Sequence, residues 1–96
     1  MDRIERIMEM EARLDRVSYW LGETEKALDG YEQIRDDLQI LSDYYGSRAW
    51  REDYEADEAG MLPHDLKRGV LSEDGIDHVI LQDDELQLRM RSLADG

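Results

Sequence analysis

The sequence contains few residues whose type and spacing could carry out chemistry. It has no Cys, which removes thiolate nucleophiles and sulfur ligands for zinc or iron–sulfur clusters. The two histidines, His64 and His78, lack the HExxH spacing of a zinc helix and the Glu-x-x-His spacing of a di-iron bundle. Asp74 and His78, four residues apart, are more typical of a surface ion pair than of half a metal site. We therefore expect no metal site.

The densest group of carboxylates lies within residues 52–58. Its acidic residues are Glu52, Asp53, Glu55, Asp57 and Glu58. As a calcium loop beginning at Asp53, this acidic run would lack the central glycine and the closing glutamate. A solvated helix face is therefore the expected role. The alternative is contact with a basic partner, through a surface that includes these five acids and Trp20, since Trp is favoured at interfaces.

The serine and glycine residues form no catalytic or phosphate-binding motif. Neither a GxSxG elbow nor a Walker or GxGxxG spacing is present. Ser47 and Ser72 are each expected to be the N-cap of a helix. Lys67-Arg68, the one adjacent basic pair, is expected to dock against the chain's own acidic helix, with an anionic ligand as the alternative. We expect no catalytic residue and no cofactor, and hence a protein that is not an enzyme.

The charge of the chain excludes several partners. The net charge is −13, from 25 acidic and 12 basic residues. Such a chain repels the phosphates of nucleic acids and anionic membranes, while it favours association with basic proteins. The longest apolar run, Val79–Leu81, is far shorter than the ~20 residues that span a membrane. We expect a cytoplasmic protein that binds neither nucleic acid directly nor membranes.

The N-terminal half of the chain has the periodicity of a long helix over residues 2–45. Apolar residues recur there at alternating spacings of three and four, as at positions a and d of a heptad repeat. We name as the seam Ile7, Met10, Leu14, Val17, Leu21, Leu28 and Tyr31. An uninterrupted helix would be ~66 Å long, too long for the rest of the chain to cover. Either the helix kinks or turns near Asp29-Gly30 and folds back, or a second chain covers the excess.

The remaining residues predict further helices and complete an all-α single domain. Gly46 is placed to end the long helix. The pattern then predicts a short helix over 47–59, an irregular connection over 60–71 and a C-terminal helical segment over 72–94. Residues 82–85 are polar enough to divide that segment, so it contains one or two helices.

Aromatic residues gather around the predicted end of the long helix. They are Tyr44, Tyr45, Trp50 and Tyr54, with Trp20 further toward the N-terminus. At helical spacing such residues usually build a core, which is the role that we expect. A partner-binding surface is the alternative.

The central part of the chain resembles a known family. The residues that carry the resemblance are Tyr44–Ser47, Trp50, Asp53–Gly60, Leu62-Pro63 and Asp65–Asp74, with Ile4–Ile7, Glu9–Glu11 and Leu14-Asp15 near the start. Together they are similar to a bacterial family catalogued as domain-of-unknown-function family 4298. The resemblance implies a small intracellular helical protein without an assigned activity, so it assigns no functional residue.

Two functions are consistent with these observations. The first is a protein–protein interaction module that forms a homodimer through its seam by helix-on-helix packing. The second is an acidic mimic of nucleic acid that inhibits a basic bacterial protein, as a phage or mobile-element anti-defence protein would. The arginines at the N-terminus weaken the second hypothesis because they interrupt the negative surface; they are Arg3, Arg6, Arg13 and Arg16.

Overall fold

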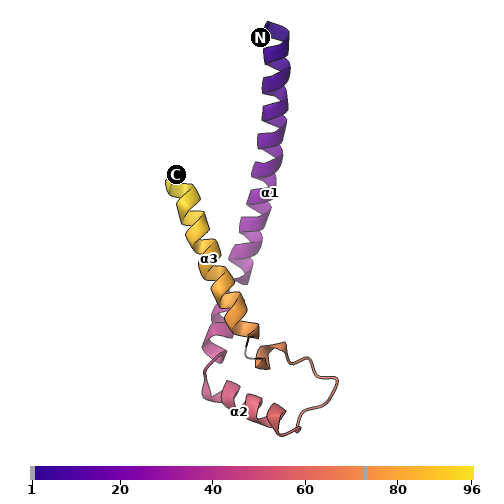
Figure 1. Ribbon diagram of the computed structural model, residues 1–96, viewed down its shortest axis with the longest axis vertical. Coiled ribbons are helices and arrows are strands. Elements are labelled where there is room, and N and C mark those ends of the chain that lie inside the picture. The colour runs from indigo at the N-terminus through magenta and orange to yellow at the C-terminus, as the bar shows by residue number, and fades with distance from the viewer. Residues whose placement is uncertain (1, 73) are drawn as a thin grey trace. The chain divides into compact units, whose positions relative to one another are not determined.

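The computed structural model describes residues 2–72 and 74–96 and is all-α. Its elements are α1 (Arg3–Tyr44), α2 (Arg48–Glu58), the 3-10 helix η1 (Gly69–Leu71) and α3 (Gly75–Asp95) (Figure 1). No strand occurs among the described residues. The predicted fold class is therefore confirmed: a long N-terminal helix is followed by a short second helix and a helix at the C-terminus.

The long helix α1 is uninterrupted from Arg3 to Tyr44. At its start the Asp2 carboxylate accepts a hydrogen bond of 2.8 Å from the backbone N–H of Glu5, which satisfies one of the free donors of the first turn. Asp29 and Gly30 both lie inside the helix. The alternative of a turn at this pair is therefore wrong, and the good helix formers around it outweigh the cost of one glycine.

The corner between α1 and α2 is made by Gly46 and Ser47. Gly46 has a φ of +82°, a left-handed conformation that residues with a Cβ adopt only under strain. The Ser47 hydroxyl accepts a hydrogen bond of 3.1 Å from the N–H of Trp50 and donates one of 2.6 Å to the carbonyl of Tyr44. Both predictions for this corner, the helix end and the N-cap, are confirmed.

The start of α3 differs from the prediction. Ser72 does not cap this helix, because its hydroxyl donates a hydrogen bond of 2.8 Å to the carbonyl of Gly69 and so closes η1. Glu73 lies outside the described residues. The helix begins at Gly75, where a Cβ would collide with the Gly69 carbonyl oxygen. The approach of η1 to the helix start, rather than a capping serine, therefore sets the boundary.

The polar residues 82–85 do not divide the C-terminal helix. The Asp83 carboxylate accepts a hydrogen bond of 2.7 Å from the Gln87 side chain, one helical turn further on. Such pairs four residues apart support a helix from its surface. The alternative of two C-terminal helices is therefore wrong.

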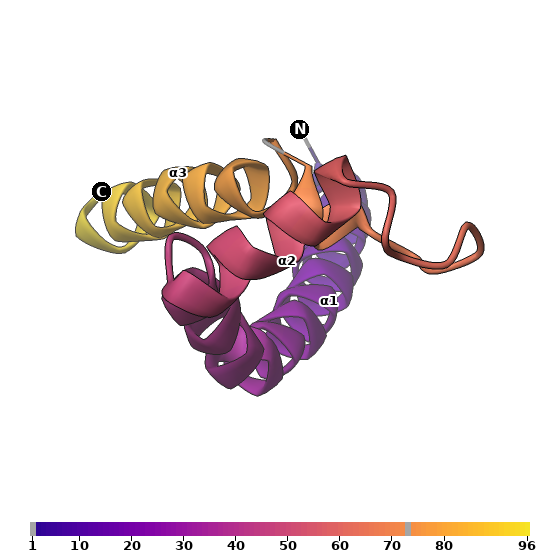
Figure 2. The same ribbon diagram turned by 90° about the horizontal axis from the view of Figure 1, so that it is seen from below.

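The chain consists of two compact units, one up to Arg35 and the other from Asp36 to Gly96. The first unit is the N-terminal part of α1 alone, and no residue of α1 is buried. In the second unit α2 and α3 both contact η1, and these elements can be followed in Figure 2. Leu71 and Ile76 are the buried apolar residues of the described chain, at 6% and 2% exposed. The core therefore lies where η1 meets the start of α3.

Candidate interaction surface

The seven seam residues all lie on α1, within the first unit. The six aliphatic side chains among them are between 45% and 66% exposed, and Tyr31 is half-buried. Their spacing keeps them on one stripe of the helix, which is about 36 Å long at 1.5 Å per residue. Monomeric proteins rarely leave a continuous apolar stripe of this length in water. The geometry of α1 therefore provides a surface suited to another helix.

Charged residues flank this stripe on both sides. One edge of the seam carries Arg6 and Arg13, and the other carries Glu11, Glu25 and Glu32. Arg13 forms an ion pair of 2.9 Å with Glu9 on the same helix. Arg6 and Glu11 are exposed and form no ion pair with any described residue. The two edges thus differ in sign, and part of their charge is available to a partner.

Trp20 lies on α1 next to the seam. Its ring packs edge-on against Tyr19, with ring centroids 5.2 Å apart, and the two residues are 61% and 60% exposed. The expected core role is therefore wrong for Trp20. The cause is that the first unit contains no second element against which the ring could pack. Trp20 and the five acids of the predicted partner surface belong to different units of the chain.

The other aromatic residues pack together in the second unit. Trp50 stacks on Tyr54, with centroids 5.2 Å apart, and meets Tyr45 edge-on at 5.3 Å. The Trp50 indole N–H donates a hydrogen bond of 2.9 Å to the carbonyl of Val70, which joins α2 to η1. All three rings are half-buried. The aromatic residues therefore cluster against η1 as half-buried rings, while the buried core itself consists of Leu71 and Ile76.

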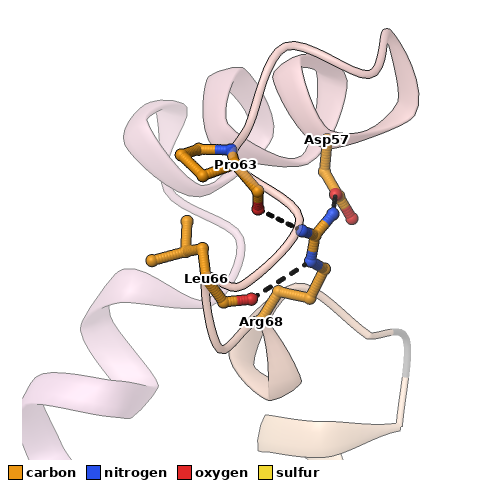
Figure 3. A network of polar contacts seen from close by, with 4 residues as sticks. All are labelled: Asp57, Pro63, Leu66 and Arg68. Atoms are coloured by element: carbon orange, nitrogen blue, oxygen red, sulfur yellow. Dashed lines mark hydrogen bonds and ion pairs between the residues drawn. The ribbon is translucent and has the colours of Figure 1, made fainter.

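Asp57, in the acidic run on α2, is held by Arg68 (Figure 3). One guanidinium nitrogen of Arg68 donates to Asp57 at 2.5 Å, and another donates to the carbonyl of Pro63 at 2.6 Å. The Nε group donates to the carbonyl of Leu66 at 3.4 Å. The predicted docking of the basic pair on the acidic helix is thus confirmed for Arg68. Lys67 is exposed and forms no ion pair in the part of the chain that the structure describes.

Replacing Arg68 with Ala is expected to lower the free energy of unfolding by about 1–3 kcal/mol, because the half-buried Asp57 carboxylate loses its partner. Arg68→Lys should restore little, since an ammonium cannot reproduce the planar fork of donors. Urea unfolding measures both effects. The matched control is Arg48→Ala, because the Arg48–Glu52 pair is 92% and 63% exposed and should contribute less than about 0.5 kcal/mol. Equal losses of unfolding free energy for Arg68→Ala and Arg48→Ala would show that the hydrogen bonds of Arg68 do not stabilise the segment between α2 and η1.

Asp53, in the same run, binds Tyr44 across the corner. The Tyr44 hydroxyl donates a hydrogen bond of 2.5 Å to the Asp53 carboxylate. This hydrogen bond, together with burial and the negative charge of Asp53, raises the pKa of Tyr44 from 10.0 to about 12. The acid therefore ties α2 to the end of α1 in addition to carrying charge.

The raised pKa of Tyr44 predicts a pH dependence of stability. The folded chain favours the neutral phenol, so the contribution of this contact is complete below pH 10.0 and is lost as the pH rises through about 12. Alkaline titration followed by tyrosinate absorbance should show a tyrosine that ionises near pH 12, and Tyr44→Phe should remove this transition. Asp53→Ala should bring the pKa of Tyr44 back toward its ordinary value. Glu55→Ala, which removes an exposed carboxylate of the same helix, should leave it unchanged, and an identical response of both variants would refute the assignment.

Three acids of the run are therefore engaged within the chain. Glu52 pairs with Arg48, Asp53 accepts from Tyr44, and Asp57 accepts from Arg68. Glu55 and Glu58 are exposed, and their side-chain carboxylates form no ion pair or hydrogen bond with a described residue. The expectation of a purely solvated acidic face thus applies to only part of the run.

The second unit also contains an open hollow of about 440 Å³. Leu41, Val70, Ile76 and Val79 line it, and Lys67 is the ionisable residue among its described lining. Neither histidine lines this hollow, and none of the described residues that line it carries a carboxylate or a hydroxyl. The described lining thus contains no paired acid and base of the kind that general acid–base catalysis uses.

Among residues 2–72 and 74–96, no three His, Asp or Glu side chains lie close enough together to hold a metal ion. No helix in the described part of the chain is both long enough and apolar enough to cross a bilayer.

The chain is thus an all-α protein with a long helix that exposes an apolar seam. It belongs to the family described as Domain of unknown function (DUF4298), which it matches over residues 7–93. The predicted family is therefore confirmed. No curated protein and no solved structure matches the chain.

Proposed function

We propose that this protein is a non-enzymatic interaction module that self-associates through the seam. The observation that carries the proposal is the exposure of the six aliphatic seam residues, between 45% and 66% in the single chain. Burial of apolar surface contributes about 25 cal/mol per Å², so pairing of two such stripes is favourable. The first unit offers no other element to cover them. A second helix with the same spacing fits the stripe because its side chains interdigitate with it.

The solution mass of the purified protein, measured by light scattering over a dilution series at two salt concentrations, tests this proposal. A dimer is expected, and it should persist at high salt because apolar burial is not screened by ions. A mass of one chain at every concentration would refute self-association. The measurement needs no partner other than the protein itself.

Mimicry of nucleic acid is the second candidate, and the net charge of −13 favours it. It has less support, because Asp53 and Asp57 are engaged within the chain. The test is capture of nucleic-acid-binding proteins from a bacterial lysate at low and at high salt. Mimicry requires a partner that is retained at low salt and released at high salt. A salt-resistant dimer without such a partner favours the interaction module.

A further inference from the structure

We propose that the second copy lies parallel to the first and in register with it along the seam. This inference rests on the proposed self-association and adds the orientation of the two helices. The occupant of the seam is then another copy of this chain, placed so that equal residue numbers lie side by side. The charges on the two edges of α1 carry the argument.

The heptad positions of α1 follow from the spacing of the seam. Ile7, Leu14, Leu21 and Leu28 occupy position a, and Met10, Val17, Thr24 and Tyr31 occupy position d. Arg6 and Arg13 are then at position g on one edge. Glu11 and Glu25 are at position e on the other edge. These edge positions are the ones that meet across a two-stranded coiled coil and decide its orientation.

A parallel pair brings opposite charges together. In that arrangement each g residue lies against the e residue of the following heptad of the other helix. Arg6 therefore lies opposite Glu11 of the second copy, and the two-fold symmetry repeats the contact. Both residues are exposed on α1, and neither has an ion-pair partner among the described residues. The parallel pair uses these two free charges.

An antiparallel pair brings like charges together. Reversal of one helix places each residue at position e against a position e residue of the other helix, and each residue at position g against a position g residue. When the two seams overlap fully, Glu11 lies against Glu25 of the second copy, again twice. Arg13 then lies against Ala27 of the second copy, so no acidic residue is opposite it. The antiparallel arrangement thus adds repulsion on one edge and gains no attraction on the other.

Exchange of charges between the edges tests the orientation. Arg6→Glu and Glu11→Arg chains should each dimerise more weakly alone, because each places like charges in both symmetric contacts. Mixed together they should form a heterodimer favoured by about tenfold over either homodimer, since both contacts become attractive. Native mass spectrometry of the mixture gives the ratio. If Glu11→Arg dimerises more tightly alone, its arginine faces Glu25, and the antiparallel arrangement replaces the proposed one.

Oxidative crosslinking gives a second test, because the chain has no Cys of its own. Thr24→Cys places a thiol at a d position that faces its own counterpart only in the parallel, in-register pair. In the antiparallel pair the two thiols are about 15 Å apart along the axis, beyond the reach of a disulfide. Ala12→Cys is the matched control, because its thiol faces away from the seam. Efficient crosslinking of Thr24→Cys alone supports the proposal, and equal crosslinking of both variants overturns it.

The two proposals fail in different ways. A dimer by light scattering without a Thr24→Cys crosslink overturns the parallel register and leaves self-association intact. A single-chain mass for the unmodified protein overturns self-association itself, and the orientation with it.

Discussion

Leu14→Asp is expected to prevent dimer formation while the second unit stays folded. Leu14 is 61% exposed on the single chain, so its loss should change the stability of the monomer by less than about 0.5 kcal/mol. In the proposed dimer Leu14 would be buried in the seam, where loss of a leucine would cost about 2–5 kcal/mol on each chain. The new carboxylates would also be buried without partners. Sedimentation over a concentration series should show a Kd higher by about 1,000-fold or more, since each 1.4 kcal/mol is tenfold.

Met8→Asp is the matched control for Leu14→Asp. It introduces the same charge on the same helix, and Met8 is 67% exposed but lies off the seam. The dimer of this variant should form nearly as tightly as that of the unmodified chain. If both variants dissociate equally, general repulsion rather than the seam controls association, and the proposed function fails.

Ile76→Ala is expected to be the most destabilising truncation in the second unit. Ile76 is 2% exposed, at the junction of η1 with α3. Removal of a fully buried isoleucine costs about 2–5 kcal/mol, because the transfer free energy is lost and a cavity remains. That is a large share of the stability of a small domain, typically about 5–15 kcal/mol. The midpoint of urea unfolding should therefore fall sharply.

The fluorescence of Trp50 can follow the unfolding of the second unit. The chain has two tryptophans, so a Trp20→Phe background leaves Trp50 as the reporter beside η1. Leu88→Ala, on the same helix but 64% exposed, is the control and should shift the free energy by less than about 0.5 kcal/mol. Equal shifts for the two truncations would show that the core does not lie at Ile76.

Local patterns predicted most of the helical structure. The heptad spacing identified α1, and the Gly46-Ser47 pair located its end and the start of α2, because a left-handed glycine and a capping hydroxyl act on neighbouring backbone groups. The same reasoning failed at Ser72. That hydroxyl has a competing acceptor, the Gly69 carbonyl, which is available only because η1 forms. A capping residue therefore predicts the start of a helix only where no neighbouring turn offers its hydroxyl another hydrogen-bond acceptor.

Contacts between elements were harder to predict. The sequence indicated that a basic pair would meet the acidic helix, but only the path of the connection selects Arg68 over Lys67. The Tyr44–Asp53 hydrogen bond was missed, because two residues on different helices meet only once the corner is known. The hollow beside Ile76 was missed too, since its walls come from three elements and no residue pattern marks it. The placement of the seven seam residues on one helix could be predicted from their spacing alone, because α1 contains all of them.

The first unit of the chain consists of helix alone, so nothing within that unit packs against the seam. A helix without tertiary contacts is only marginally stable in water, and Gly22 and Gly30 each cost about 1 kcal/mol. If pairing supplies the missing contacts, ordering and association are one equilibrium, and mass action makes the order of this segment depend on protein concentration. Its backbone amides should then exchange hydrogen with solvent more slowly as the protein is concentrated. The amides near Ile76, protected by the core of the second unit, should exchange at a rate that does not depend on concentration.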